Sequence, residues 1–256
     1  MFFKFLMKLP ILKRIIPSIL KRYVVFTGFY NKRIKLEGVI LDLDLRYLVD
    51  KIVFLHRGYE DELYFNLVKI IKNNEIDYFL DIGSCWGIYS LRLTKKFKNL
   101  KILAFDPIKS NVNRIINSLK LNEFKNIKTF HTALGNKKGE IVLGASEDFS
   151  PNYQINQKNP SILEKSKIDL LDNLLSLKKN TLVIKIDVEG FEIEVLKGAK
   201  QLLLNNDCFL QIETFGDNKN EVFNFLNKLN YQLVSTNTHN KTDLFFSNFT
   251  FQKIEI

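Results

Sequence analysis

Acidic side chains that close apolar runs are the residues of this sequence best placed to do chemistry. Four acids of this kind occur: Asp81, Asp106, Asp187 and Glu213. Each run is continuous and apolar, which is typical of a buried parallel strand. Because ligands of open parallel sheets bind at the carboxyl ends of the strands, we expect the four acids to converge on one crevice.

The first of these acids begins a turn that contains two glycines. The stretch 78–91 runs from an apolar strand through Asp81, Gly83 and Gly87 into apolar residues at helical spacing. Glycine allows a sharp turn and a close approach of the backbone to a ligand. Asp106 follows one strand-helix-strand repeat later, where a carboxylate can accept both hydroxyls of a ribose. An adenosine-bearing cofactor is therefore expected.

The residues of the turn indicate which cofactor this is. A dinucleotide pyrophosphate favours Gly-x-Gly-x-x-Gly and free amides at a helix start. This turn instead has Asp81 two residues before its first glycine, and bulky Trp86 where a phosphate loop needs room. An acid beside the turn suits a cationic sulfonium, so S-adenosylmethionine fits better than NAD.

The elements around these acids alternate between strand and helix. We expect strands at 78–81, 101–106, 127–134, 181–187 and 208–213, and helices at 59–71, 88–97, 111–121, 162–177, 190–204 and 218–229. An antiparallel pair is expected within 34–55, and a hairpin-like pair at 231–235 and 243–247. An irregular insertion is expected at 135–160, with one short strand-like piece at 140–143. The pattern predicts one α/β domain.

The charge of the chain is concentrated at its start. Nine of the 38 Lys and Arg residues lie before Glu37, and no acid lies there. The rest of the chain contains all 28 acids and the other basic residues, so it is nearly neutral. We therefore divide the chain into a basic amphipathic extension, 1–36, and a main domain, 37–256. The neutral main domain argues against a nucleic-acid partner.

The extension allows several interpretations. Its apolar residues fall roughly on one helical face, which Pro10 and Pro17 are expected to break into short pieces. This face can pack on the main domain, contact a membrane surface, or serve another partner. Lysines and prolines interrupt any run that could span a bilayer, and no cleavage site for a signal peptide is visible. With only Cys85 and Cys208, a cytoplasmic protein is expected, with membrane association at the inner face as an alternative.

At this point the sequence resembles the FkbM family of S-adenosylmethionine-dependent methyltransferases. The shared motifs lie between about residues 38 and 248: Gly58-Tyr-Glu60, Phe79-Leu-Asp-Ile-Gly-Ser-Cys-Trp-Gly87, Ala104-Phe-Asp-Pro107, Ala133-Leu-Gly135, Lys185-Ile-Asp-Val-Glu-Gly190 and Leu210-Gln-Ile-Glu213. The family usually has Ala-Asn where this chain has Ser84-Cys85. The resemblance implies a class I methyltransferase fold of Rossmann-like type, with a mostly parallel seven-stranded sheet, an antiparallel last strand and helices on both faces.

The resemblance also implies a cofactor site. The residues carried over to it are Glu60 at the methionine end, Asp81, Gly83, Ser84, Cys85 and Gly87 in the turn, Asp106 and Pro107 near the ribose, Ala133 and Leu134 near the adenine, and Asp187. Family members are associated with O-methylation of sugars and natural products. This implies a methyltransferase acting on a hydroxyl of a sugar, glycolipid or polysaccharide precursor.

Methyl transfer to oxygen needs an aligned hydroxyl and a group that removes its proton. The candidate bases are Asp187, Glu189 and Glu192, with His131 and His239 as further candidates. Structural interpretations are also open: Glu192 can complement the helix dipole, and Asp187 can cap the same helix. His131 can be a structural histidine, and His239 a solvated one. Lys185 can neutralise a neighbouring acid, and no metal site is expected because no third ligand accompanies Asp187 and Glu189.

Two other functions stay open: methylation of a non-sugar molecule or macromolecule, and a non-catalytic cofactor-binding scaffold.

Overall fold

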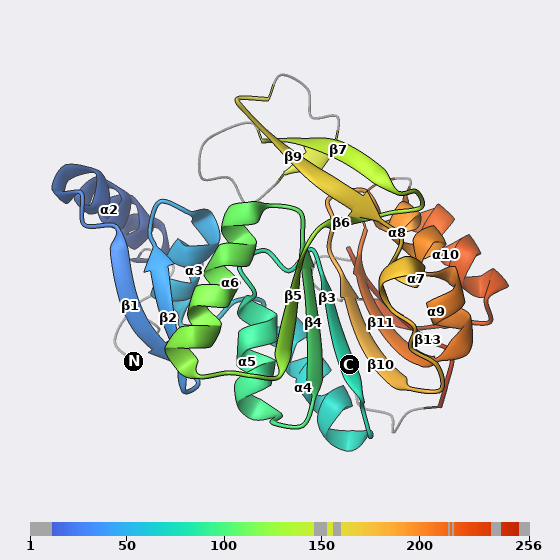
Figure 1. The fold of residues 1–256 in the computed structure, drawn as a ribbon. Helices are drawn as coiled ribbons and strands as arrows, with labels where there is room; N and C mark the ends of the chain where they lie inside the picture. Colours follow the sequence, from blue (N-terminus) through green and yellow to red (C-terminus); the bar gives the residue numbers. More distant parts are fainter. Residues whose placement is uncertain are drawn as a thin grey trace.

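The computed structural model describes residues 12–145, 153–155, 160–214, 216, 218–236 and 242–250. Its centre is a seven-stranded sheet with the order β12-β13-β11-β10-β3-β4-β5 (Figure 1). The strands are β3 (Tyr78–Ile82), β4 (Lys101–Asp106), β5 (Ile127–His131), β10 (Thr181–Ile186), β11 (Asp207–Glu213), β12 (Gln232–Thr236) and β13 (Asp243–Ser247). The strands β3, β4, β5, β10 and β11 run parallel, and β13 is antiparallel to β11. The predicted seven-stranded sheet with an antiparallel last strand is confirmed.

Each face of this sheet is covered by its own apolar core. Phe79, Val183 and Phe209 belong to one cluster, whereas Leu80, Ile184 and Leu210 belong to the other. This separation follows from the alternation of side chains along a strand. Since both faces are buried, the strands read as continuous apolar runs, and that is why they were recognisable in the sequence.

Helices cover both faces, as expected. On the Phe79 side lie α4 (Asp61–Asn73) and α5 (Ile88–Lys96), and α6 (Lys109–Asn122) follows β4. On the Leu80 side lie α7 (Leu171–Leu174), α8 (Glu192–Gly198), α9 (Lys200–Asn205) and α10 (Asn218–Lys228). The helix expected at 190–204 is thus divided in two near Ala199.

The insertion forms a sheet of its own. Strands β6 (Ala133–Leu134), β7 (Gly139–Ala145), β8 (Gln154–Ile155) and β9 (Ile162–Asp169) have the order β6-β9-β7-β8. Figure 1 shows β7 and β9 above the carboxyl ends of the large sheet. The helix expected at 162–177 is wrong, because β9 occupies 162–169. The burial of β9 alternates over its second half, with Ser166 and Ile168 inward, and β7 supplies the antiparallel partner.

The start of the described chain forms a separate layer beside the large sheet. Helix α2 (Leu12–Thr27) precedes the antiparallel pair β1 (Asn31–Leu36) and β2 (Val39–Asp44), and α3 (Leu48–His56) follows. The expected antiparallel pair is confirmed, but the residues after it are helical. Helix α2 also continues through Pro17, which removes one backbone donor without ending the helix. The boundary expected after residue 36 falls between two paired strands.

A buried arginine joins this layer to the helices of the main sheet. The guanidinium of Arg92 in α5 donates to Glu37 at 2.9 Å, to Asp61 at 3.1 Å and to the carbonyl of Tyr59 at 3.3 Å. It also stacks 3.6 Å from the centroid of the Tyr64 ring. Because these partners belong to the hairpin, to α4 and to the loop before it, Arg92 holds that loop in position beside the sheet. In the part of the chain that the structure describes, no helix is long and apolar enough to cross a membrane.

Candidate active site

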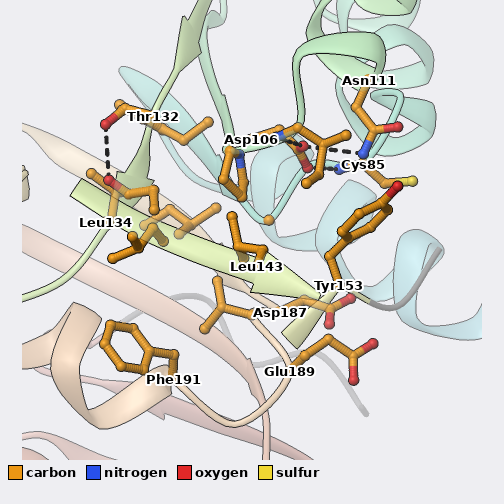
Figure 2. A pocket seen from close by; sticks show the side chains of 18 of the residues that line it. Cys85, Asp106, Asn111, Thr132, Leu134, Leu143, Tyr153, Asp187, Glu189 and Phe191 are labelled. Carbon is orange, nitrogen blue, oxygen red and sulfur yellow. Dashed lines mark hydrogen bonds between the residues drawn. The ribbon is translucent and has the colours of Figure 1, made fainter. Parts of the chain in front are cut away.

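A pocket opens at the carboxyl ends of β3, β4 and β10, beneath the sheet of the insertion (Figure 2). Its lining combines three acids with apolar and aromatic side chains: Val49, Tyr59, Ile82, Gly83, Cys85, Phe105, Asp106, Pro107, Ile108, Asn111, Thr132, Ala133, Leu134, Ile141, Leu143, Tyr153, Asp187, Val188, Glu189 and Phe191. In Figure 2, Asp106 and Asn111 lie on one side of the pocket, and Asp187 and Glu189 on the other. Leu143 lies between them, and Leu134 and Phe191 lie to one side, so that the three form an apolar wall of the pocket.

The turn after β3 forms the floor of this pocket and requires its glycines. Gly83 has φ +77°, and a Cβ there would lie 1.8 Å from the carbonyl oxygen of Asp187. Gly87 has φ +81°, and its Cβ would lie 2.9 Å from Ile115. Both positions therefore combine a left-handed backbone with close packing. The backbone N–H groups of Gly83 and Ser84 both donate to the carbonyl of Phe105 at 3.0 Å, which joins the turn to β4.

Asp106 is held by three donors at the end of β4. Its Oδ1 accepts from the N–H of Ile108 at 2.9 Å and from Nδ2 of Asn111 at 3.1 Å, and its Oδ2 accepts from the N–H of Cys85 at 2.8 Å. Each carboxylate oxygen can accept about two hydrogen bonds, so Oδ2 retains one acceptor position. Burial raises the pKa of Asp106 to about 7, although these donors oppose the shift.

A buried lysine lies beneath the other acids of the site. Nζ of Lys185, in β10, donates to Oδ2 of Asp187 at 2.7 Å. Lys185 is opposite Asp81 in the register of β10 and β3, so the two side chains share one face of the sheet. Burial by itself lowers the pKa of Lys185, but Asp187, Glu60 and Asp81 outweigh burial and raise it above the usual value. The ion pair with Asp187 therefore favours the charged form of Lys185.

Further acids extend this face beyond Lys185. Glu213, at the end of β11, is opposite Asp243 of β13, and the negative charges of both Asp187 and Asp243 act on it. Burial first, and these two carboxylates next, raise the pKa of Glu213 to about 8. Asp81 is also buried, which raises its pKa, and its Oδ2 accepts from Ser90 Oγ at 2.6 Å. Several acids thus surround one lysine, so this face of the sheet holds more acidic groups than basic ones.

Glu189 lies at the mouth of the pocket in an uncommon backbone conformation, with φ +53°. Burial and the charge of Asp187 raise its pKa, while a hydrogen bond from Gln154 opposes the shift. Two other non-glycine residues near the site, Glu60 and Cys85, also have positive φ, at 44° and 50°. Backbone strain of this kind concentrates at functional sites.

Three predicted site acids, Glu192, Glu60 and Asp81, do not line the pocket. Glu192 is fully buried at the start of α8, where its carboxylate accepts from the N–H of Gly190 at 2.8 Å and from Asn218 at 3.4 Å. This is the contact of an acid that caps a helix. Glu60 lies behind Tyr59, and its Oε2 accepts from the hydroxyl of Tyr89 at 2.8 Å. Its charge nevertheless acts on Lys185.

The other predicted residues divide in the same way. The pocket lining includes Gly83, Cys85, Asp106, Pro107, Ala133, Leu134, Asp187 and Glu189. Asp81, Ser84 and Gly87 support the turn from behind, outside the lining. His131 is exposed and contacts the carbonyl of Pro107 at 3.0 Å, and His239 lies outside the described residues.

The structure corrects the role expected for Trp86. Its ring is buried and lies 4.9 Å below the guanidinium of Arg114, not in the pocket. The preference for a cationic ligand over a pyrophosphate therefore depends on the acids of the site and not on a bulky side chain in the phosphate position. Asp50 completes this support, because it is buried and ion-paired to Arg114.

Several pocket residues were not recognised from the sequence. Leu143 and Tyr153 come from the insertion, where no repeating pattern placed them. Asn111 and Phe191 carried a signal, since Asn111 lies in the helix that follows Asp106 and Phe191 directly follows the Lys-Ile-Asp-Val-Glu-Gly motif. Within the described residues, no group of three His, Cys, Asp or Glu side chains is arranged to hold a metal ion.

A solved structure has a similar fold, and a further protein is similar in sequence. A solved FkbM methyltransferase from Methylobacillus flagellatus KT has a TM-score of 0.50 and 18% identity, over 69% of this chain and 44% of that protein. Methyltransferase 1 of Beauveria bassiana (strain ARSEF 2860) is 23% identical over 144 residues, 47% of this chain and 57% of that protein. The chain thus spans about half the length of these two relatives. The likeness to the solved structure shows that the chain has the class I methyltransferase fold, and the expected likeness to FkbM proteins is confirmed in the fold.

The family can be stated more narrowly. Residues 59–215 match the family model described as the Vibrio cholerae RfbT protein. Because this match covers more than half of the chain, the protein belongs to that family.

Proposed function

We propose that this protein transfers the methyl group of S-adenosylmethionine to a hydroxyl of a sugar, glycolipid or polysaccharide precursor. The observation that carries the proposal is the arrangement of acids around one pocket. Asp106 offers an acceptor for a ribose on one side, and Asp187 and Glu189 lie on the other. A donor bound along the pocket would then present its reactive end to the two acids that could accept a proton.

The lining fits this cofactor. The free acceptor position on Asp106 Oδ2 suits a ribose hydroxyl. The apolar wall of Leu134, Leu143 and Phe191 suits the face of an adenine ring. When bound, S-adenosylmethionine supplies an activated methyl group on a positively charged sulfur. The excess of acids around Lys185 favours such a cation and disfavours a pyrophosphate.

Glu189 is the best candidate for the general base. It lines the pocket, and its raised pKa makes it a stronger base than an ordinary carboxylate. Asp187 is adjacent, with one oxygen engaged by Lys185 at 2.7 Å, so we assign it the role of orienting the acceptor hydroxyl. Glu192 is assigned a structural role, because its carboxylate is consumed by the helix start.

The acceptor class follows the motifs shared with FkbM proteins and the composition of the chain. The nearly neutral main domain disfavours a nucleic acid, whose phosphates require a basic surface. A non-sugar hydroxyl compound is the second candidate for the same chemistry, and the acids at the pocket are compatible with both. A purely scaffolding role would not need a base with a raised pKa beside the pocket.

Two measurements test this proposal. Calorimetry with the purified protein should detect binding of S-adenosylmethionine and not of NAD; absence of heat with S-adenosylmethionine would refute the assignment. Transfer of labelled methyl groups should then be screened over monosaccharides, nucleotide sugars, glycan fragments, non-sugar alcohols and RNA. Incorporation into RNA alone would contradict the proposed acceptor.

A matched pair of variants tests the base. Glu189→Gln should lower kcat by about 10²–10⁴-fold and leave cofactor binding nearly unchanged. Glu194→Gln is the control, because that acid lies on the same helix start region but pairs with Lys197 at 3.2 Å. Equal turnover of the two variants would show that Glu189 is not the base.

A further inference from the structure

Helix α2 presents an apolar stripe that the rest of the described chain does not cover. Ile15, Ile19 and Phe26 are 45%, 59% and 92% exposed. Their spacing of four and seven residues places them on one line along the helix. Val24, half a turn away from this line, is 5% exposed and belongs to the core beneath. The helix is thus anchored by one side and shows apolar side chains on the opposite side.

This arrangement differs from the usual scatter of exposed apolar residues. Single exposed apolar side chains are common on soluble proteins, but a row of large ones marks an interaction surface. Phe29, two residues past the end of the helix, is also a large apolar residue and is 66% exposed. Figure 1 shows α2 at one end of the molecule, beside β1. None of Ile15, Ile19 and Phe26 belongs to the lining of the pocket.

The charge around the stripe identifies the partner. Arg22, between Ile19 and Phe26 on the same line, is exposed. The sequence of the helix also contains Lys13, Arg14 and Lys21, and no acid precedes Glu37. An apolar row with basic residues and no acids is the composition of helices that lie in the interface of an anionic membrane. A second copy of this chain is disfavoured, because a symmetric contact would bring these positive charges together.

We propose that α2 docks the protein on an anionic lipid surface through Ile15, Ile19, Arg22 and Phe26. The helix lies parallel to the membrane, with its Val24 side on the protein and the stripe in the headgroup region. The catalytic domain is thereby held near acceptors that are made at, or attached to, a membrane. This docking depends on residues outside the pocket lining and can be tested separately from the methyl transfer.

Sedimentation with vesicles tests the proposal on the full chain. The protein should sediment with vesicles of phosphatidylcholine and phosphatidylglycerol, and much less with phosphatidylcholine alone. Binding should fall as salt is raised, because the Debye length shrinks from about 10 Å at 0.1 M to about 3 Å at 1 M. Failure to bind anionic vesicles, or equal binding to both kinds, would overturn the proposal.

Variants assign the binding to the stripe. Ile19→Glu and Phe26→Glu should each lower the affinity for anionic vesicles by at least about tenfold, and Arg22→Gln by about fivefold. Leu204→Glu is the matched control, since Leu204 is 51% exposed on α9, and it should bind as the unchanged protein does. Equal losses in Ile19→Glu and Leu204→Glu would refute a specific surface.

Two further readouts exclude other causes. Circular dichroism and calorimetry with S-adenosylmethionine should be unchanged in the α2 variants, because the stripe is exposed and outside the pocket lining. A wild-type dimer in sedimentation velocity that Ile19→Glu abolishes would show instead that a second copy covers the stripe. If vesicle binding is lost while cofactor binding persists, the docking proposal holds independently of the proposed reaction.

Discussion

Replacing Asp106 by asparagine tests the cofactor assignment most directly. The side chain keeps its size, so any effect comes from the lost charge and from one lost acceptor. Three donors converge on the native carboxylate, from Cys85, Ile108 and Asn111. In Asp106→Asn an NH₂ group replaces one carboxylate oxygen. If it takes the place of Oδ2, it faces the N–H of Cys85 and cannot accept a hydrogen bond from a ribose hydroxyl.

The expected magnitude follows from these contacts. The free acceptor position on Oδ2 allows one strong hydrogen bond to a ribose, and a hydrogen bond to a charged group contributes about 1.5–3 kcal/mol. Its loss should weaken S-adenosylmethionine binding about 10- to 150-fold. The buried donor that loses its acceptor should in addition lower the free energy of unfolding by about 1–3 kcal/mol.

Calorimetry and urea denaturation measure the two effects separately. Asp42→Asn is a suitable control, because Asp42 is also paired, with Arg33 at 2.6 Å, but its side chain is 57% exposed and does not line the pocket. The control should bind the cofactor normally. If Asp106→Asn binds S-adenosylmethionine within about twofold of the native protein, Asp106 does not contact the ribose and the orientation proposed for the cofactor is wrong.

Three other perturbations follow from the structure. Burial raises the pKa of Asp106 to about 7. The affinity for S-adenosylmethionine should therefore be constant above about pH 8 and fall by up to about tenfold per pH unit as the pH drops through 7. Calorimetry of Asp106→Asn should show no such dependence on pH. The raised pKa also means that the native state holds this proton more tightly than the unfolded state, so the contribution of Asp106 to stability should decrease as the pH rises from about 4 to about 7. Arg92→Leu should lower the free energy of unfolding by about 3 kcal/mol or more, because the acids that pair with the buried guanidinium lose their partner. Arg33→Leu, at an exposed ion pair, should lower it by under about 1 kcal/mol in the same urea titration. Gly83→Ala should destabilise the protein by at least about 2 kcal/mol, because its Cβ would overlap the carbonyl of Asp187, and Gly139→Ala, with nothing within 4 Å, should not.

The parallel strands were predictable because both faces of the sheet are buried. Four of them, β3, β4, β10 and β11, are largely apolar, and the acid at or next to the end of each marks the edge where ligands bind. The fifth, β5, is only partly buried. Asp106 and Asp187 were therefore located from the sequence, together with the turn at Gly83. Glu213 follows the same rule, but it joins the charged face near Asp243 and not the pocket lining.

The insertion was not predictable in the same way. The apolar residues of the segment 162–169 are Ile162, Leu163 and Ile168, which lack the regular alternation of a half-buried strand. The sequence therefore does not indicate a strand there. The strand that forms there is stabilised by pairing with β7, a partner outside the segment, so local periodicity could not reveal it. Leu143 and Tyr153 reach the pocket only because these strands form, and no motif of the sequence indicated them.

The role of Lys185 shows how a short motif acts through strand geometry. Lys185 and Asp187 are two residues apart, so the alternation of a strand directs both to the same face. The register with β3 then places Asp81 on that face as well, and β11 brings Glu213 beside Asp187. Burial first, and the carboxylates of Asp187 and Asp243 next, raise the pKa of Glu213 to about 8. A cationic methyl donor would supply the missing positive charge at this face, whereas a dinucleotide would add negative charge to it.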